Sequence, residues 1–254
     1  MRQILTLTLF AAALWARPAA AVEELVSGLS TDFVQISSNF TGTEIVLFGA
    51  IENSDPFSGP ADHDIILVVR GPETDMTVRR KKRFLAIWVN TEQVLFTGLP
   101  GYYYLASTKP LEDIATPLTL ERFGLGMEYL RPVTQRLDDP DQAAEFQAAI
   151  VRNMVRSELY LQTTNGIEFL SRTLFRARVP LPATVPPGQY RAEVYLFDNG
   201  TVISAQSSPL FVDKIGLERE LYDMSHEATL AYGLMVVFLS FLFGWLGYFF
   251  FRQR

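Results

Sequence analysis

The stretch from Pro186 to Val212, PPGQYRAEVYLFDNGTVISAQSSPLFV, decides how we interpret the fold. Two runs rich in apolar and aromatic residues lie on either side of Asp198-Asn199-Gly200. Asn and Gly tolerate the positive φ angles of a type I′ turn, so this triplet is a strong signal for a β-hairpin. The stretch therefore predicts two long antiparallel strands joined by a tight turn.

The start of this stretch and the residues upstream of it extend the β pattern. Gly188-Gln189-Tyr190 is similar to the tyrosine corner of immunoglobulin-like sandwiches, in which the phenol bonds back to the backbone. Upstream, TLFRARVPLP alternates between two faces, with Leu174, Arg176 and Arg178 on one side and Phe175, Ala177 and Val179 on the other. We predict a mainly β fold built on an Ig-like β-sandwich.

The first half of the chain also predicts strands. Its apolar runs are short, rich in Val, Ile, Phe and Tyr, and separated by Gly, Pro, Asn or Asp. They read FVQISSNF (33–40), TEIVLFGAIE (43–52), HDIILVVRG (63–71), FLAIWVN (84–90), EQVLFTG (92–98) and YYYLAS (102–107). Regular short strands of this kind are typical of a sandwich.

The middle of the chain has a helical pattern instead. Asp139 is suited to an N-cap and Pro140 to the first helical position. An apolar stripe with a spacing of four follows, at Phe146, Ile150 and Met154. We predict a helix over about residues 140–160. A shorter helix around residues 120–130 is weakened by its two glycines.

The two ends of the chain indicate export and a membrane anchor. Residues 228–251 are uncharged and mostly apolar, and a helix of this length, about 36 Å, crosses a hydrocarbon core of about 30 Å. Trp245 and Tyr248 fit an interfacial belt, and Arg252 and Arg254 fit a cytoplasmic tail. Residues 1–21 have the charged start, apolar centre and small-residue cleavage site of a signal peptide.

These features define an expected topology and organisation. The N-terminal domain is expected to lie across the membrane from the cytoplasm, the chain to cross the membrane once, and the C-terminus to be cytoplasmic. The expected segments are a signal peptide (1–21), an N-terminal β-sandwich part (22–110), a helical insertion (111–165), a C-terminal β part (166–214), a juxtamembrane stalk (215–227), a transmembrane helix (228–251) and a cytoplasmic tail (252–254).

Charge and cysteine content exclude several classes of function. Residues 22–227 carry 28 acidic and 18 basic side chains, so this region has a net charge of −10. Such a domain is poorly suited to general binding of nucleic acids or anionic membranes. The chain has no cysteine, which excludes thiol catalysis and cysteine-ligated zinc.

A basic run interrupts this acidic background. Arg79-Arg80-Lys81-Lys82-Arg83 places Arg79, Lys81 and Arg83 on one face if the segment is extended. This row is a candidate site for an anion or an acidic partner. The alternative is an edge strand that its charges protect against unwanted pairing.

Other candidate groups are fewer. Tyr102 and Tyr104 share a face, either as core packing or as part of the same binding surface. Asp62-His63-Asp64 is better explained by a polar turn than by a metal site, because adjacent strand residues point to opposite faces. Local motifs for a serine nucleophile, a zinc protease, a P-loop or a dinucleotide are absent from the sequence. We therefore predict no enzyme, no cofactor and no metal.

The predicted span has a stripe of small residues. Gly233, Ser240, Gly244 and Gly247 fall on one side of a helix, among larger apolar neighbours. Small residues allow helices to approach closely in lipid. The stripe predicts packing against another helix, in a second copy or in a permease.

The whole pattern resembles a known family. The segments that carry the resemblance are STDFVQISSNFTGTEIVLFGAIE, ILVVRGP, VRRKKRFLAIWVN, LFRARVPLPATVPPGQYRAEVYLF and FVDKIGLERELYDMSHEATLAYGL. They resemble a family of uncharacterised alphaproteobacterial transmembrane proteins over nearly the whole mature chain. The resemblance implies a bacterial inner-membrane protein with a periplasmic N-terminal domain and a C-terminal span. It also implies a membrane partner, because members are often encoded near sulfite-exporter-type permeases.

We expect a binding or accessory module that is anchored in the inner membrane. Its partners would be the lipid bilayer and an integral membrane protein, such as an anion or sulfur-compound permease, with no nucleic acid. Two alternatives remain open at this point. One is a periplasmic enzyme that uses carboxylates on an anionic substrate, and the other is a solute receptor without an output domain of its own.

Overall fold

The computed structural model describes residues 23–37, 40–54, 59, 63–84, 87–134, 140–214 and 229–251. The fold is mainly β, as predicted, with a few helices. Its strands are β1 (Glu24–Leu29), β2 (Phe33–Ile36), β3 (Gly42–Glu52), β4 (Asp64–Arg70), β5 (Glu73–Phe84), β6 (Ile87–Pro100), β7 (Tyr103–Ser107), β8 (Val133–Thr134), β9 (Tyr160–Thr164), β10 (Ile167–Phe169), β11 (Leu174–Pro182), β12 (Gly188–Asp198) and β13 (Thr201–Lys214). Its helices are α2 (Leu111–Ile114), α3 (Pro117–Phe123), the 3₁₀ turn η2 (Met127–Tyr129), α4 (Pro140–Arg156) and α6 (Thr229–Phe251).

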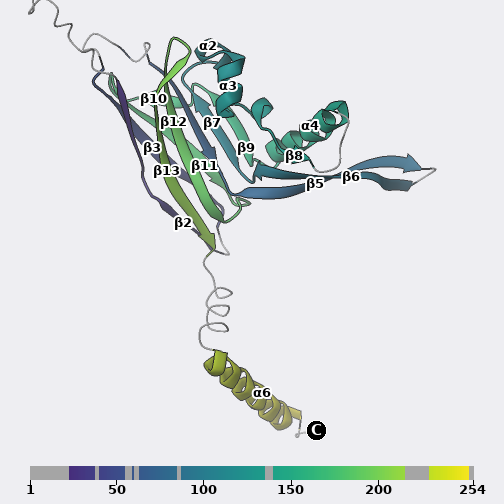
Figure 1. Cartoon of the computed structure of the whole chain (residues 1–254). Coiled ribbons are helices and arrows are strands. Elements are labelled where there is room, and N and C mark those ends of the chain that lie inside the picture. Colours follow the sequence, from purple (N-terminus) through teal and green to yellow (C-terminus); the bar gives the residue numbers. More distant parts are fainter. Residues whose placement is uncertain are drawn as a thin grey trace, which may run out of the picture.

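Two sheets face each other across the larger core (Figure 1). One has four strands in the order β1-β3-β11-β10, and the other has six in the order β2-β13-β12-β4-β7-β9. Strands from before and after the helical segment mix in both sheets, because β3 pairs with β11 and β4 pairs with β12. The predicted N-terminal and C-terminal β parts therefore share one core.

The hairpin that opened the sequence analysis forms as predicted. Strands β12 and β13 pair antiparallel along their whole length. Asn199 and Gly200, at the turn, have φ angles of 47° and 81°, which are the positive values that a type I′ turn requires. The Tyr190 hydroxyl donates to the Pro186 carbonyl oxygen at 2.5 Å, so the phenol bonds back to the backbone as expected for a tyrosine corner.

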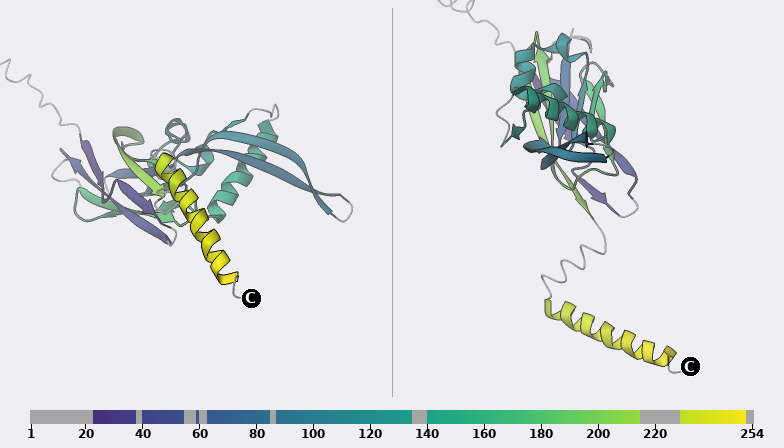
Figure 2. Two further views of the ribbon diagram at one scale, coloured as in Figure 1. Left: turned by 90° about the horizontal axis from the view of Figure 1, so that it is seen from below. Right: turned by 90° about the vertical axis from the view of Figure 1, so that its right-hand side faces the viewer.

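A second core covers the other face of the six-stranded sheet. Helices α2, α3 and α4 pack there together with the base of the β5–β6 hairpin (Figure 2). Phe146 and Ile150 from the predicted stripe of α4 are buried, and Met154 packs beside them. The periodicity of this segment therefore identified both the helix and its buried face.

The helix boundaries needed correction. The helix predicted around residues 120–130 is α3, which starts earlier, at a Thr116 N-cap whose side chain accepts from the Thr119 amide. Gly124 ends α3 in the left-handed conformation (φ 62°), as glycine does at many helix ends. Helix α4 stops at Arg156, because a turn with Glu158 in the left-handed conformation (φ 59°) follows, and strand β9 begins at Tyr160. The proposed N-cap, Asp139, lies outside the described residues.

The strand prediction was wrong at the basic run. Residues 87–90 and 92–98 of the two predicted strands lie in one strand, β6, whereas Phe84 ends β5, the strand that holds the basic run. Residues 85–86 lie outside the described residues. The pairing of β5 and β6 shifts by one residue at Arg80/Lys81, which leaves Thr91 as the extra residue of a β-bulge. The polar residues of β6 marked this bulge and were mistaken for the end of a strand.

Gly49 of β3 gives a test of the sandwich core. It lies opposite Phe175 of β11, and a Cβ atom at Gly49 would lie 2.2 Å from the end of the Phe175 ring. We expect Gly49→Ala to lower the free energy of unfolding by about 2 kcal/mol, because the buried ring must move. Urea denaturation measures the loss. Gly28→Ala is the matched control, since nothing lies within 4 Å of its new methyl group. Equal effects of the two substitutions would contradict this account.

Helix α6 follows the β domain in the chain. It covers most of the segment that the sequence analysis predicts as a transmembrane helix. Across the described residues, no helix combines the length and hydropathy that crossing a membrane requires. The predicted signal peptide, stalk and cytoplasmic tail lie outside the described residues.

Candidate functional site: a cationic hairpin arm

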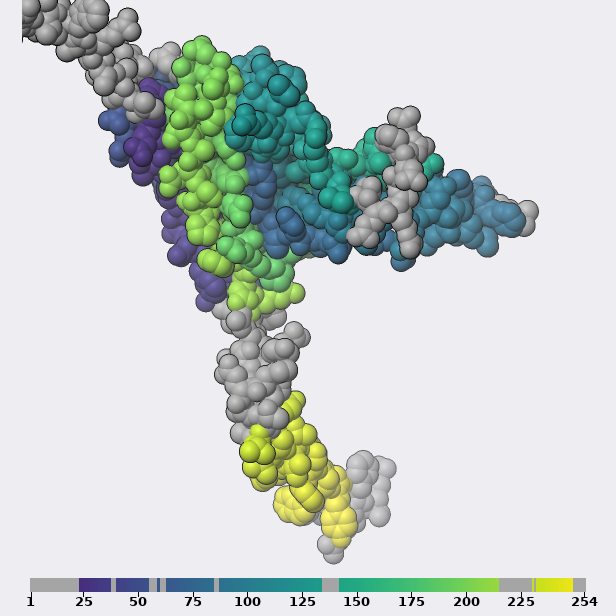
Figure 3. Space-filling view, in the orientation of Figure 1, coloured from purple at the N-terminus to yellow at the C-terminus, as the bar shows by residue number. Residues whose placement is uncertain are grey.

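Strands β5 and β6 form a long hairpin that projects from one side of the domain (Figure 3). We call this hairpin the arm. Its base belongs to the second core, where Val94, Phe96 and Leu99 of β6 are buried. Met76 and Val78 of β5 pack against the same core. Beyond Val78 the side chains of β5 are exposed, except for the half-buried Arg80, so the outer half of the arm has little contact with the body.

The outer face of the arm carries the row predicted from the sequence. Arg79, Lys81 and Arg83 alternate with the inward positions of β5, and all three are exposed. The Arg79 side chain donates to Gln93 at 3.2 Å. Among the described carboxylates, none forms a salt bridge with any of these three side chains. The row is therefore an uncompensated cationic surface within the described part of the domain.

The bulge at Thr91 determines which side chains of β6 lie on the same face as the cationic row. With the shifted register, Arg83 pairs with Trp88, and Phe84 pairs with Ile87 at the end of the arm. Directly paired residues lie on the same face of a sheet. If the register continued without the bulge, Thr91 would pair with Lys81, and Trp88 would pair with Phe84 on the other face. The bulge therefore places an indole beside the cationic row.

The inner face of the arm is braced by helix α4. Arg80 forms salt bridges with Glu92 of β6, at 3.1 Å, and with Glu145 of α4. Its guanidinium also lies 4.8 Å from the centre of the Phe146 ring, a cation–π distance. Lys82 pairs with Glu92 at 3.3 Å. Two of the five basic residues are thus used within the protein, and the other three face outward.

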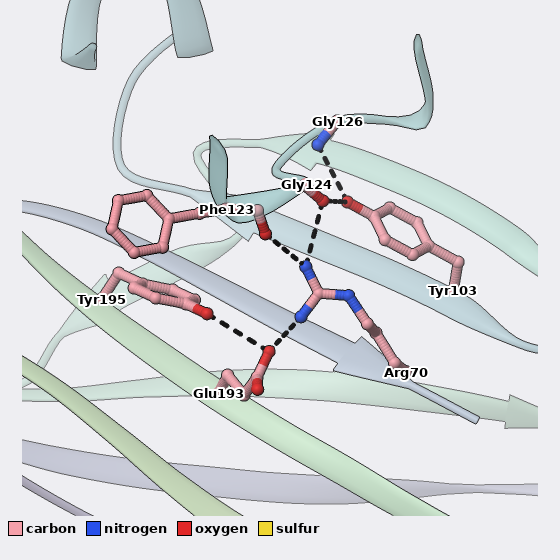
Figure 4. Close-up of polar contacts among 7 residues, drawn as sticks. All are labelled: Arg70, Tyr103, Phe123, Gly124, Gly126, Glu193 and Tyr195. Atoms are coloured by element: carbon pink, nitrogen blue, oxygen red, sulfur yellow. Dashed lines mark hydrogen bonds and ion pairs between the residues drawn. The ribbon is translucent and has the colours of Figure 1, made fainter. Parts of the chain in front are cut away.

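A polar network at the foot of the arm fixes α3 to the six-stranded sheet (Figure 4). Arg70 of β4 pairs with Glu193 of β12, and its other terminal nitrogen donates to the Phe123 and Gly124 carbonyls at 2.8 and 3.0 Å. The Tyr103 hydroxyl donates to Gly124 at 3.1 Å and accepts from the Gly126 amide at 2.9 Å. Burial raises the pKa of Tyr103 to about 12. The sequence analysis missed this network, since its members come from four distant segments.

The predicted tyrosines lie in the core instead of beside the row. Tyr102 and Tyr104 do share a face, but they are only 1% and 4% exposed. Tyr102 donates to the Pro180 carbonyl, and burial raises the pKa of both phenols. Neither phenol can meet a ligand at the surface, so the binding surface considered below omits them.

The remaining candidate groups also lie apart from the arm. His63 is buried, with Nδ1 3.7 Å from a Glu23 carboxylate oxygen, and Asp64 pairs with Lys109 at 2.7 Å. In α6, Cβ atoms built at Gly233, Gly244 and Gly247 would have no other atom within 4 Å. The Ser240 hydroxyl donates to the Val236 carbonyl oxygen at 2.8 Å. Within the described chain, the small-residue stripe is therefore open.

Fold and site together describe a mainly β domain with a projecting cationic arm, followed in the chain by an apolar helix. The chain belongs to the family described as "Putative transmembrane protein (Alph_Pro_TM)", which matches residues 24–253. No curated protein matches the chain. Membership of this family agrees with the resemblance noted from the sequence.

Proposed function

We propose that the protein is a membrane-anchored binding module that acts beside an integral membrane partner. In this proposal the Ig-like β domain lies in the periplasm, α6 crosses the inner membrane and the C-terminus is cytoplasmic. The partner would be a permease, such as one for anions or sulfur compounds. The arm is the observation that carries the proposal, because it presents an open cationic surface on an otherwise acidic protein.

No described helix combines the length and hydropathy that crossing a membrane requires, so the proposal that α6 spans the membrane rests on its uncharged sequence and its exposed apolar side chains. Residues 228–251 have no charged side chain, and the 23 residues of α6 correspond to about 35 Å of helix. Large apolar side chains such as Leu234, Phe238 and Phe241 are exposed along it. Exposed apolar surface of this extent is stable in lipid or against a partner, but not in water.

The shape of the arm favours a binding module over the two alternatives from the sequence, which were an enzyme and a solute receptor. An enzyme or receptor for a small anion would hold the row in a cleft. Two surface hollows, of about 300 and 650 Å³, are lined by residues other than the row. The row lies instead on one face of a hairpin, where it suits an extended anionic surface.

Cross-linking in native membranes, followed by mass spectrometry, tests the proposal. We expect the wild-type protein to give a specific adduct with an integral membrane protein. Ser240→Leu combined with Gly244→Leu should weaken that adduct about tenfold, since the larger side chains keep a neighbouring helix away. Alkaline extraction should leave the variant in the membrane, because leucine favours insertion.

Phe238→Leu, on the opposite side of α6, is the control and should give the wild-type adduct. Recovery of the wild-type protein alone, without any specific adduct, would contradict the accessory role. Extraction of the wild-type protein at alkaline pH would contradict the span. An unchanged adduct in the double variant would mean that α6 does not contact the partner.

A further inference from the structure

The end of the arm is rich in exposed apolar side chains. Phe84, Ile87 and Trp88 are 65%, 62% and 68% exposed. Phe84 and Ile87 lie on one face and Trp88 on the other, so the tip is apolar on both sides. Directly behind the tip lie Lys81, Lys82 and Arg83. Aromatic residues next to lysine and arginine are the combination that favours a membrane–water interface.

We propose that the tip of the arm, residues 81–84 and 87–88, docks on the anionic lipid surface of the membrane in which α6 is anchored. This inference rests on the proposed function, and it names the anionic surface that the cationic row binds. The apolar side chains would enter the boundary of the hydrocarbon layer. The cations behind them would bind lipid phosphate groups.

The spacing along the arm matches the layers of a bilayer. Arg83 and Lys81 lie one and three residues behind Phe84, which is within about 10 Å at 3.4 Å per residue. The polar headgroup layer on each side of a bilayer is about 5–8 Å thick. When the tip reaches the hydrocarbon boundary, these cations are at the depth of the phosphates. Binding to a pocket in a protein would not require apolar side chains at the end of the arm with cationic side chains directly behind them.

The length of the arm removes the main objection to lipid binding, which is the acidic character of the domain. Phe84 lies six residues beyond Val78, the last residue of β5 that packs on the second core. This is a reach of about 20 Å, and Arg80, which pairs with Glu145 of α4, lies four residues or about 14 Å behind Phe84. Both distances exceed the Debye length of about 8 Å at physiological ionic strength. Residues 79–93 carry five basic side chains and one acidic one. The membrane would therefore meet the charge of the arm and not the charge of the body.

The connection to α6 keeps the tip close to lipid. Only residues 215–228 separate β13 from α6, and 14 residues span at most about 50 Å. Tethering at this range gives the tip a high effective concentration at the bilayer surface. A weak interfacial contact would therefore be populated in the anchored protein. Each cation near an anionic surface strengthens such a contact about fivefold.

Fluorescence quenching by spin-labelled lipids tests the proposal on the full chain. The protein has no cysteine, so Ile87→Cys creates a single site for a fluorophore. The protein is inserted into vesicles of phosphatidylcholine with or without phosphatidylglycerol. We expect lipid-borne nitroxides to quench the label at position 87 at least fivefold more with phosphatidylglycerol. Lys81→Glu with Arg83→Glu should remove that difference, as should high salt.

Two further labels make the outcomes distinct. Leu118→Cys, exposed on α3 of the body, should show little quenching in any vesicle. Phe238→Cys, in α6, reports whether the helix is in lipid. Quenching at 238 with none at 87 would overturn the docking proposal and leave the anchor intact. No quenching at 238 would overturn the anchor itself. Equal quenching at 87 with and without phosphatidylglycerol, or cross-links from position 87 to a protein in its place, would also overturn the proposal.

Discussion

Raising the pH from neutral to about 11 is expected to lower the free energy of unfolding by about 5 kcal/mol. The four tyrosines with the largest pKa shifts are the main cause. Burial raises the pKa of Tyr102, Tyr103, Tyr160 and Tyr190, in the case of Tyr103 to about 12. A loss of this size is comparable to the whole stability of many domains.

The direction of the effect follows from proton binding. In the unfolded chain a tyrosine ionises near pH 10, whereas these four keep their protons in the folded protein. Stability is therefore complete below about pH 10 and falls as the pH rises towards the folded pKa values. Each tyrosine contributes a slope of about 1.4 kcal/mol per pH unit. A phenol that ionises inside the folded protein can no longer donate a hydrogen bond. Tyr160, for example, would lose its hydrogen bond to the Pro100 carbonyl oxygen, which is 2.7 Å long.

Urea denaturation across this pH range measures the slope, and absorbance at the tyrosinate band follows ionisation. Tyrosinate from the buried residues should appear together with unfolding. Tyr160→Phe should reduce the slope by about a quarter, at a fixed cost near 1 kcal/mol for its lost hydrogen bond. Ionisation of all tyrosines near pH 10 in a protein that stays folded would contradict the prediction.

Replacing Arg70 by methionine is expected to cost about 3 kcal/mol, because it leaves the Glu193 carboxylate without its counter-charge in a largely buried position. The carbonyls of Phe123 and Gly124 also lose their donor. For a domain of this size, the melting temperature should fall by about 6–12 °C. Thermal unfolding followed by circular dichroism measures the change.

Arg191→Met is the matched control, since Arg191 pairs directly with Arg70 in the sheet but is exposed. It should change stability by no more than about 0.5 kcal/mol. The combined change Arg70→Met and Glu193→Leu should recover most of the loss, because it removes the unpaired charge. A double variant as unstable as Arg70→Met would show that the carbonyl contacts, not the ion pair, hold α3 in place.

The site was only partly visible in the sequence. Alternation along an extended strand was enough to place Arg79, Lys81 and Arg83 on one face, and the structure agrees. The same rule placed Tyr102 and Tyr104 together, but it could not distinguish a buried face from an open one. That distinction depends on the four-stranded sheet, whose strands β3 and β11 cover this face across the larger core. The anchoring role of α6 and its small-residue stripe stay predictions.

Local patterns by themselves determined the hairpin at Asn199-Gly200, the bonded Tyr190, the alternation of β11 and the buried stripe of α4. Each depends on a turn, a strand period or a helical period within a few residues, so neighbours in the chain carry the information. Tertiary structure alone decided that β5 and β6 pair through a bulge, leave the core and form an arm. It also decided that Arg70 meets Glu193 and the end of α3. These features depend on register and on contacts between distant segments, and no local pattern records either of them.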